Sequence, residues 1–224
     1  MSIQKSEIQL DVNGQLVNAY LVSPAGGGPG VLVLHAWWGL KPFFKQVCDQ
    51  LAEHGYMALA PDLYQGQIAN TIDEAKALRG PIEEGGSDLM EATVLAAKDH
   101  LLGLTKNKIG VIGFSMGAAW SLVVASADPN KVAATGLFYG TYSGMDFSKM
   151  KSKIIGHFAE DDEWEPLDEV KAMGKSMKDA GLDVTFHFYP KVGHWFVESD
   201  RPEYDSAAAS LAWERTFEFL KKNL

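Results

Sequence analysis

The fold is indicated most directly by the stretch Lys108-Ile109-Gly110-Val111-Ile112-Gly113-Phe114-Ser115-Met116-Gly117-Ala118-Ala119-Trp120. It begins with an apolar run typical of a buried strand and continues into an apolar helix. Between the two, Ser115 stands in the pattern Gly-x-Ser-x-Gly with Gly113 and Gly117. A serine on so sharp a strand-to-helix turn leaves no room for neighbouring Cβ atoms, which explains the two glycines.

Ser115 has two interpretations. In one it only caps a helix after a glycine turn. In the other its hydroxyl projects above a sheet at a helix N-terminus, where backbone N–H groups stabilise developing negative charge. The strand-like run before the turn and the apolar helix after it favour the second interpretation, that of a nucleophile.

Length and composition predict one α/β domain spanning residues 1–224, because no Pro/Ser-rich linker or charge block divides the 224 residues. No apolar run is long enough to cross a bilayer, and the first seven residues lack the apolar segment of a secretory signal. The only cysteine is Cys48, which we expect to be a small buried residue. These features predict a cytoplasmic protein without a membrane partner. The net charge of −9 argues against nucleic-acid binding.

Strands and helices alternate along the chain. Two short β-prone runs joined at Asn13-Gly14 predict an antiparallel hairpin at the start. Further strands are expected at 31–34, 57–60, 109–112, 133–139, 153–158 and 184–189, and helices at 43–54, 72–78, 88–102, 167–180 and 203–220. Breaks are expected at Arg79-Gly80-Pro81 and Glu84-Gly85-Gly86. Alternation of this kind predicts a mostly parallel central sheet with helices on both faces.

A serine hydroxyl needs a base to remove its proton and a carboxylate to orient that base. The expected order along this architecture is Ser, then Asp or Glu, then His, each in a loop beyond a strand end. An acidic loop, residues 159–166, follows one predicted strand, and His194 follows another. Alone, His194 would be a surface histidine and the acidic loop a solvated turn. Together, in the right order, they predict a catalytic triad with Ser115.

Three carboxylates compete for the orienting role. Asp162 is our first choice, with Asp161 and Glu160 as alternatives, because only one of them can approach His194. The oxyanion hole should use the backbone N–H of Met116 and a second N–H from Trp37, in the loop after the first buried strand. Aromatic residues at six positions could line a substrate pocket or fill the core: Trp37, Trp38, Tyr64, Trp120, Trp164 and Trp195.

From about Val31 to its end, the chain resembles the dienelactone hydrolases of the α/β-hydrolase superfamily. The resemblance is carried by Ala60-Pro61-Asp62-Leu63-Tyr64, Gly113-Phe114-Ser115-Met116-Gly117, Phe138-Tyr139-Gly140, Asp162 with Pro166, Gly193-His194-Trp195-Phe196 and Arg215-Thr216. It implies an α/β-hydrolase fold, with Ser115 as nucleophile, Asp162 as acid and His194 as base. The Trp37 and Met116 amides would form the oxyanion hole.

The chain also departs from the best-known members of that family. They have a cysteine where this chain has Ser115, and a glutamate that regulates the thiol where it has Ala36. They bind a substrate carboxylate through arginines, one of them at the position of Glu198. Arg79 lies in the segment that supplies another. A glutamate pointing into the pocket would repel a carboxylate, so we expect small neutral esters to be preferred.

The sequence therefore predicts a serine esterase that needs no cofactor or metal and cleaves a small carboxylic ester or lactone through an acyl-Ser115 intermediate. Residues expected to contact the substrate are Trp38, Tyr64, Arg79, Trp164, Trp195 and Glu198. Two other functions remain open: a ligand-binding protein on the same scaffold, and a peptidase or acyltransferase. The sequence indicates no oligomeric state.

Overall fold

The computed structural model describes residues 2–81 and 87–224, which group into two compact units, Met1–Ile109 and Gly110–Leu224. Each unit has four strands with helices beside them. The prediction of a single domain stays a prediction.

The first unit begins with a long antiparallel hairpin, β1 (Ile3–Val12) and β2 (Gln15–Pro24). Asn13 and Gly14 turn the chain with φ angles of 54° and 85°, as the Asn-Gly pair predicts. Both strands are longer than their apolar runs, because the backbones pair continuously from Ile3 with Pro24 to Val12 with Gln15. A ladder of backbone hydrogen bonds holds polar residues as well as apolar ones.

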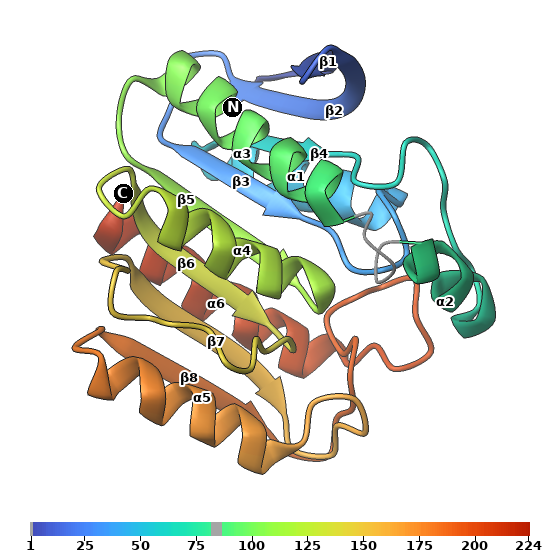
Figure 1. The fold of residues 1–224 in the computed structure, drawn as a ribbon, viewed down its shortest axis with the longest axis vertical. Coiled ribbons are helices and arrows are strands. Elements are labelled where there is room, and N and C mark those ends of the chain that lie inside the picture. Colours follow the sequence, from blue (N-terminus) through green and yellow to red (C-terminus); the bar gives the residue numbers. More distant parts are fainter. Residues whose placement is uncertain (1, 82–86) are drawn as a thin grey trace. The chain divides into compact units, whose positions relative to one another are not determined.

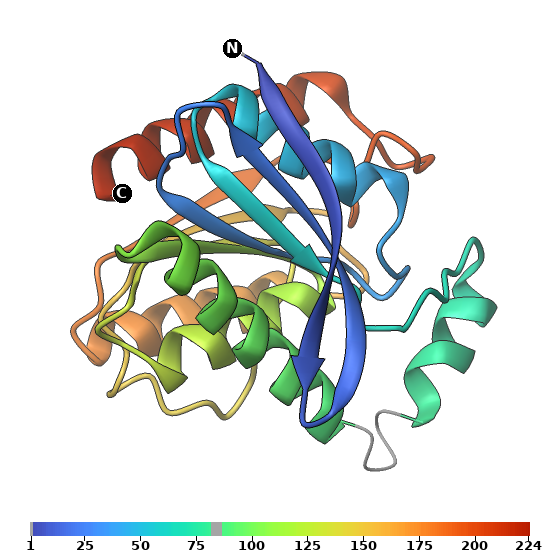
Figure 2. The same cartoon turned by 90° about the horizontal axis from the view of Figure 1, so that it is seen from above.

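Two buried strands follow, β3 (Gly30–Leu34) and β4 (Met57–Pro61). The strand order in this unit is β1-β2-β4-β3, with β2 antiparallel and β3 parallel to β4. Helix α1 (Pro42–Glu53) covers one face of these strands and α3 (Ser87–Thr105) the other (Figures 1 and 2). Cys48 is completely buried in α1, as expected.

Helix α2 (Ile72–Pro81) corrects one predicted boundary. We expected a break at Arg79-Gly80-Pro81, but these residues complete the last turn of the helix. The helix ends at Pro81, three residues beyond the predicted end at Leu78. The second expected break, at Glu84–Gly86, lies outside the described residues.

The second unit has the strand order β5-β6-β7-β8. Its strands are β5 (Ile109–Phe114), β6 (Val132–Phe138), β7 (Lys153–Ala159) and β8 (Val184–Tyr189). The β6–β7 and β7–β8 pairs are parallel. The predicted pattern, antiparallel strands at the start and parallel strands thereafter, is therefore confirmed.

Helices cover both faces of these four strands. In both views α4 (Met116–Ala127) and α5 (Leu167–Asp179) lie on one face, and α6 (Ser206–Asn223) lies on the other (Figures 1 and 2). Helix α6 starts three residues later than expected, because the Asp205 side chain caps it by accepting a hydrogen bond from the Ala208 N–H at 2.8 Å. Beneath α6, the rings of Phe114 and Phe138 stack at 4.7 Å.

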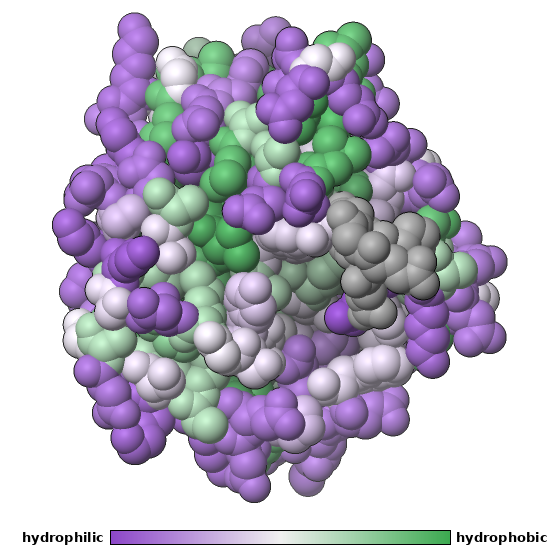
Figure 3. Space-filling model, in the orientation of Figure 1, coloured by the Kyte–Doolittle hydropathy of each residue, from purple (hydrophilic) through white to green (hydrophobic). Residues whose placement is uncertain are grey.

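On the face shown in Figure 3, hydrophilic residues predominate and hydrophobic ones form only small areas between them. Within residues 2–81 and 87–224, no helix combines the length and the apolar character that a bilayer crossing requires.

Candidate active site

The turn between β5 and α4 holds Ser115 in a strained backbone conformation. Its φ is 50° and its ψ is −115°, values that a residue with a side chain rarely adopts. Ser115 precedes α4 without capping it through its side chain, so its hydroxyl remains available for other contacts. A Cβ on Gly113 would lie 2.0 Å from the carbonyl oxygen of Gly117, so the turn requires glycine there.

His194 lies in the loop after β8 and is almost completely buried, with 4% of its surface exposed. Its Nε2 is 2.9 Å from Oγ of Ser115, and its Nδ1 is 2.7 Å from Oδ2 of Asp162. A carboxylate can only accept, so Nδ1 carries the proton and Nε2 accepts the hydrogen bond from the Ser115 hydroxyl. The imidazole therefore presents a lone pair to the serine proton.

Asp162 is held by the loop after β7. Its Oδ1 accepts hydrogen bonds from the N–H groups of Trp164 at 2.8 Å and Glu165 at 3.0 Å, and its Oδ2 faces His194. The side chains of His194 and Asp162 are only 3% and 2% exposed. The two alternative acids, Asp161 and Glu160, are exposed. The structure thus brings Asp162 to His194 and directs both of its oxygens.

Two aromatic rings enclose the imidazole of His194. The ring of Tyr139 lies 4.9 Å away and that of Trp195 lies 4.8 Å away, both edge-on. Trp164 in turn lies 5.7 Å from Trp195. These two tryptophans, which we expected near a substrate, therefore lie next to His194 and Asp162.

Glu198 has a different position from the one expected. It is completely buried, and its Oε1 accepts a hydrogen bond from the Tyr139 hydroxyl at 2.9 Å. A carboxylate that points into the pocket would be exposed to solvent before substrate binds, whereas Glu198 is an interior residue. The expected repulsion of an anionic substrate by Glu198 is therefore not supported by its position.

The remaining predicted residues are placed by their own elements. Met116 is the first residue of α4, so its amide is among those that point out of the helix N-terminus. Trp37, Trp38 and Tyr64 are buried in the first unit, and Arg79 is exposed on α2. Their roles at the site remain predictions.

Sequence reasoning missed two residues beside the triad. It assigned no role to Tyr139, although Phe138-Tyr139-Gly140 was among the motifs that carried the family resemblance. It also overlooked Glu165, whose carboxylate accepts a hydrogen bond from Thr141 at 2.5 Å. Burial raises the pKa of Glu165. Only proximity in the folded chain distinguishes Glu165 from its acidic neighbours.

A cavity of about 550 Å³ lies between the loop after β6 and helix α5. Thr141 lies in the wall of this cavity and donates a hydrogen bond to Glu165, whose N–H donates in turn to Asp162. The cavity is lined by Thr141, Tyr142, Ser143, Gly144, Met145, Phe147, Glu169, Ala172, Met173 and Ser176. Its volume is in the range of small-molecule sites.

No group of three or more His, Cys, Asp or Glu side chains in the described part of the chain is arranged to hold a metal ion. The chemistry supported by the triad geometry is removal of a serine proton by a neutral imidazole whose other nitrogen is hydrogen-bonded to a carboxylate.

Solved structures of other proteins share this fold over nearly their whole length. A dienelactone hydrolase-like promiscuous phosphotriesterase from metagenomic libraries has a TM-score of 0.86 at 19% identity, over 100% of this chain and 99% of that one. The dienelactone hydrolase of Anabaena variabilis has a TM-score of 0.74 at 21% identity, over 100% of both chains. This likeness, with the observed strands and helices, defines an α/β-hydrolase fold.

The family follows from sequence. The family model described as "Dienelactone hydrolase family" matches residues 17–224, so the chain belongs to this family. A protein of Aquifex aeolicus named "Putative carboxymethylenebutenolidase" is 34% identical over 97% of this chain and 98% of its own length. The protein usf of Aquifex pyrophilus is 35% identical over the same shares. The chain is accordingly a carboxylic ester hydrolase of the dienelactone hydrolase type.

Proposed function

We propose that the chain is a serine hydrolase that cleaves a small carboxylic ester or lactone through an acyl-Ser115 intermediate. The observation that supports this most directly is the continuous line of hydrogen bonds from Asp162 through His194 to Ser115. Each of the three residues follows a different strand of the second unit, so the arrangement depends on the sheet rather than on one local motif.

In the first step Oγ of Ser115 attacks the ester carbonyl carbon while Nε2 of His194 takes the serine proton. The resulting oxyanion would accept hydrogen bonds from the backbone N–H of Met116 and from a second amide, for which we retain Trp37. The C–O bond to the leaving alcohol then breaks, and His194 returns its proton to that oxygen. In a lactone the alcohol stays attached to the acyl group.

Deacylation repeats the sequence with water. His194 removes a proton from a water molecule, whose oxygen attacks the acyl carbon, and the carboxylic acid leaves as Ser115 regains its proton. Throughout, Asp162 holds the Nδ1–H tautomer and stabilises the imidazolium that forms at each proton transfer. Over the whole cycle the ester and one water molecule are consumed: the serine proton goes to the alcohol, and water supplies the proton that Ser115 regains.

The proposed substrate is small and uncharged. The net charge of −9 provides no general attraction for anions, and the chain has only three arginines, Arg79, Arg201 and Arg215. Arg215 is engaged inside the second unit, where it donates a hydrogen bond to the Tyr189 hydroxyl at 3.2 Å. Trp164 and Trp195, beside the triad, are proposed to contact an apolar part of the substrate.

A fluorophosphonate label followed by peptide mapping tests the proposal. An activated serine reacts with the phosphorus and becomes covalently modified, so we expect the label on the peptide that contains Ser115 and none in Ser115→Ala. A folded wild-type protein that resists the reagent would instead favour the alternative, a ligand-binding protein on a hydrolase scaffold. If Ser115 is labelled, product analysis separates the remaining functions. An esterase hydrolyses an ester, a peptidase hydrolyses an amide, and an acyltransferase transfers the acyl group to an added alcohol.

A further inference from the structure

The pair formed by Tyr139 and Glu198 is buried beside the triad. Both residues are 0% exposed, and the Tyr139 hydroxyl donates to Oε1 of Glu198 at 2.9 Å. Burial and the neighbouring Glu198 carboxylate raise the pKa of Tyr139 well above its usual range. The phenol therefore keeps its proton and donates it in the hydrogen bond to Glu198.

Tyr139 lies at the end of β6, the neighbour of strand β5, which leads to Ser115. It follows β6 directly with a φ of 37°, and its N–H donates to the carbonyl of His157 at 2.8 Å. A Cβ on the next residue, Gly140, would lie 2.3 Å from the carbonyl oxygen of Ser115. The backbone after Tyr139 is thus in direct contact with the Ser115 turn, so Tyr139 has a defined position relative to the serine.

Glu198 belongs to the same loop as His194. Its N–H donates to the Trp195 carbonyl at 2.8 Å, and its own carbonyl accepts from the Arg201 N–H at 2.9 Å. Trp195 itself has a φ of 63°, a left-handed conformation that a bulky residue rarely adopts. The loop that carries His194 therefore contains a strained residue and closes in a turn at Glu198.

The Tyr139 side chain connects these two anchor points. Its ring lies edge-on to His194 with 4.9 Å between ring centroids, and its hydroxyl binds Glu198, four residues further along the loop. One side chain thus contacts the imidazole and also holds the end of the turn that carries it. Small displacements of a general base reduce its efficiency steeply, because proton transfer depends on hydrogen-bond geometry.

We propose that Tyr139 and Glu198 act together as positioning residues that hold the imidazole of His194 in line with Ser115. This rests on the proposed function, because it assigns the pair to the step in which His194 removes the serine proton. Glu198 then serves the base through Tyr139 and does not recognise the substrate.

The test measures how fast a fluorophosphonate modifies Ser115, because this rate reports the serine–histidine step without the natural substrate. The variants are Tyr139→Phe, Glu198→Leu, Glu198→Gln and the double variant Tyr139→Phe/Glu198→Leu. Circular dichroism and a thermal melt select a temperature at which all of them are folded. KM for a neutral ester is measured in parallel.

We expect Tyr139→Phe and Glu198→Leu each to slow the labelling about 10-fold, because each breaks the hydrogen bond. Glu198→Gln should stay within about threefold of wild type, since its amide oxygen can still accept. The double variant should be no slower than the slower single variant, because the two residues act as a unit. KM should change less than the labelling rate.

Two substitutions in the same loop serve as matched controls. Tyr204→Phe removes one hydroxyl and Ser199→Ala removes another, and both parent residues are exposed. We expect both variants to be labelled at the wild-type rate. If either control variant were labelled as slowly as Tyr139→Phe, any change in this loop would slow labelling. That result would contradict a specific role for the buried pair.

Other outcomes would overturn the proposal in distinguishable ways. Folded Tyr139→Phe and Glu198→Leu that label at the wild-type rate would show that the pair only stabilises the fold. Unchanged labelling of Glu198→Gln with an altered preference between a neutral and a carboxylated ester would show a substrate contact instead. Wild-type protein that is not labelled at Ser115 would overturn the proposed function itself, and this inference with it.

Discussion

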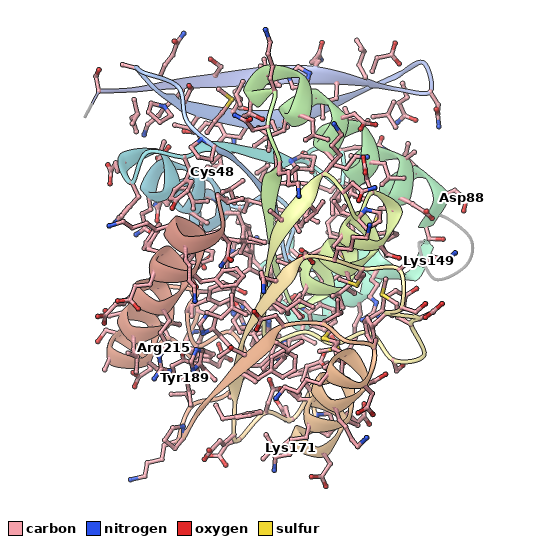
Figure 4. The ribbon with its side chains drawn as sticks, turned by 90° about the vertical axis from the view of Figure 1, so that its left-hand side faces the viewer. Cys48, Asp88, Lys149, Lys171, Tyr189 and Arg215 are labelled. Atoms are coloured by element: carbon pink, nitrogen blue, oxygen red, sulfur yellow. The ribbon has the colours of Figure 1, made fainter. Side chains whose placement is uncertain are left out.

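Nε2 of His157 lies 2.9 Å from Oγ1 of Thr216, and this contact joins β7 to α6 inside the second unit. The Thr216 hydroxyl donates to the carbonyl of Ala212 at 2.8 Å, so it accepts the proton that His157 carries on Nε2. Nδ1 then accepts from the Tyr189 hydroxyl at 2.8 Å, and Arg215 donates to that oxygen at 3.2 Å. Tyr189 and Arg215 lie side by side in Figure 4.

This network gives the Arg215-Thr216 pair a structural role. Thr216 and His157 are both 0% exposed, so neither can replace a lost hydrogen bond with one to solvent. We expect Thr216→Val to lower the free energy of unfolding by about 1–3 kcal/mol, because it leaves a buried N–H without its acceptor. Urea denaturation measures this loss, and kcat at neutral pH should change less than about twofold. Thr216→Ser keeps the hydroxyl and should recover most of the stability; equal stability of Thr216→Val and wild type would contradict the network.

His157 also makes stability depend on pH. Burial, with the nearby His187 and Arg215, lowers the pKa of His157 well below its ordinary value. Above a pH of about 6.5 the residue is neutral in both the folded and the unfolded chain, and its contribution is fully present. Below that pH the unfolded chain binds a proton that the folded chain does not, so stability falls by up to about 1.4 kcal/mol per pH unit.

Urea denaturation at several pH values between 7.5 and 5 measures this slope. His157→Gln should show a smaller slope than wild type, whereas His100→Gln, which changes an exposed histidine, should keep it. If wild type and His157→Gln showed the same dependence of unfolding free energy on pH, groups other than His157 would cause the acid sensitivity.

Ser115 and His194 are expected to act as one unit. Ser115→Ala and His194→Ala should each lower kcat for an ester by about 10⁴-fold or more, because either change removes the nucleophile-base step. The double variant should be hardly slower than the single ones. Steady-state kinetics on purified, folded variants provides the comparison, and strictly additive losses would count against a shared step.

The acid is tested by two neighbouring substitutions of the same kind. Asp162→Asn should lower kcat by about 10²- to 10⁴-fold, because an amide no longer fixes the Nδ1–H tautomer of His194. Asp161→Asn changes an exposed carboxylate and should remain within about twofold of wild type. If the Asp161 variant were crippled and the Asp162 variant nearly normal, the assignment of the acid would be wrong.

Activity should also fall in acid, because a protonated imidazole cannot accept the serine proton. The measurement is kcat/KM for a neutral ester between about pH 4 and pH 9, with protein stability checked at each pH to separate unfolding from inhibition. A profile that stays flat down to about pH 4, where a free imidazole is protonated, would remove His194 as the base.

Local sequence was sufficient wherever backbone geometry depends on neighbouring residues. Asn13-Gly14 turns the first hairpin, and Gly113 leaves the space that the Ser115 turn requires. Continuous apolar runs located the buried strands β3, β4, β5, β6 and β7, because strands covered on both faces need apolar residues on both sides. The strand ends in turn indicated which loops carry Ser115, Asp162 and His194.

The tertiary structure decided what depends on contacts between distant residues. In the acidic loop, Glu160, Asp161 and Asp162 are adjacent carboxylates, yet only the backbone path of the loop turns Asp162 inward to His194. A glutamate in a loop is ordinarily exposed, but Glu198 is buried and accepts a hydrogen bond from the hydroxyl of Tyr139, 59 residues earlier in the chain. Periodicity in the sequence predicts which apolar residues are buried, whereas a buried polar group is stabilised by a partner that only the folded chain brings near.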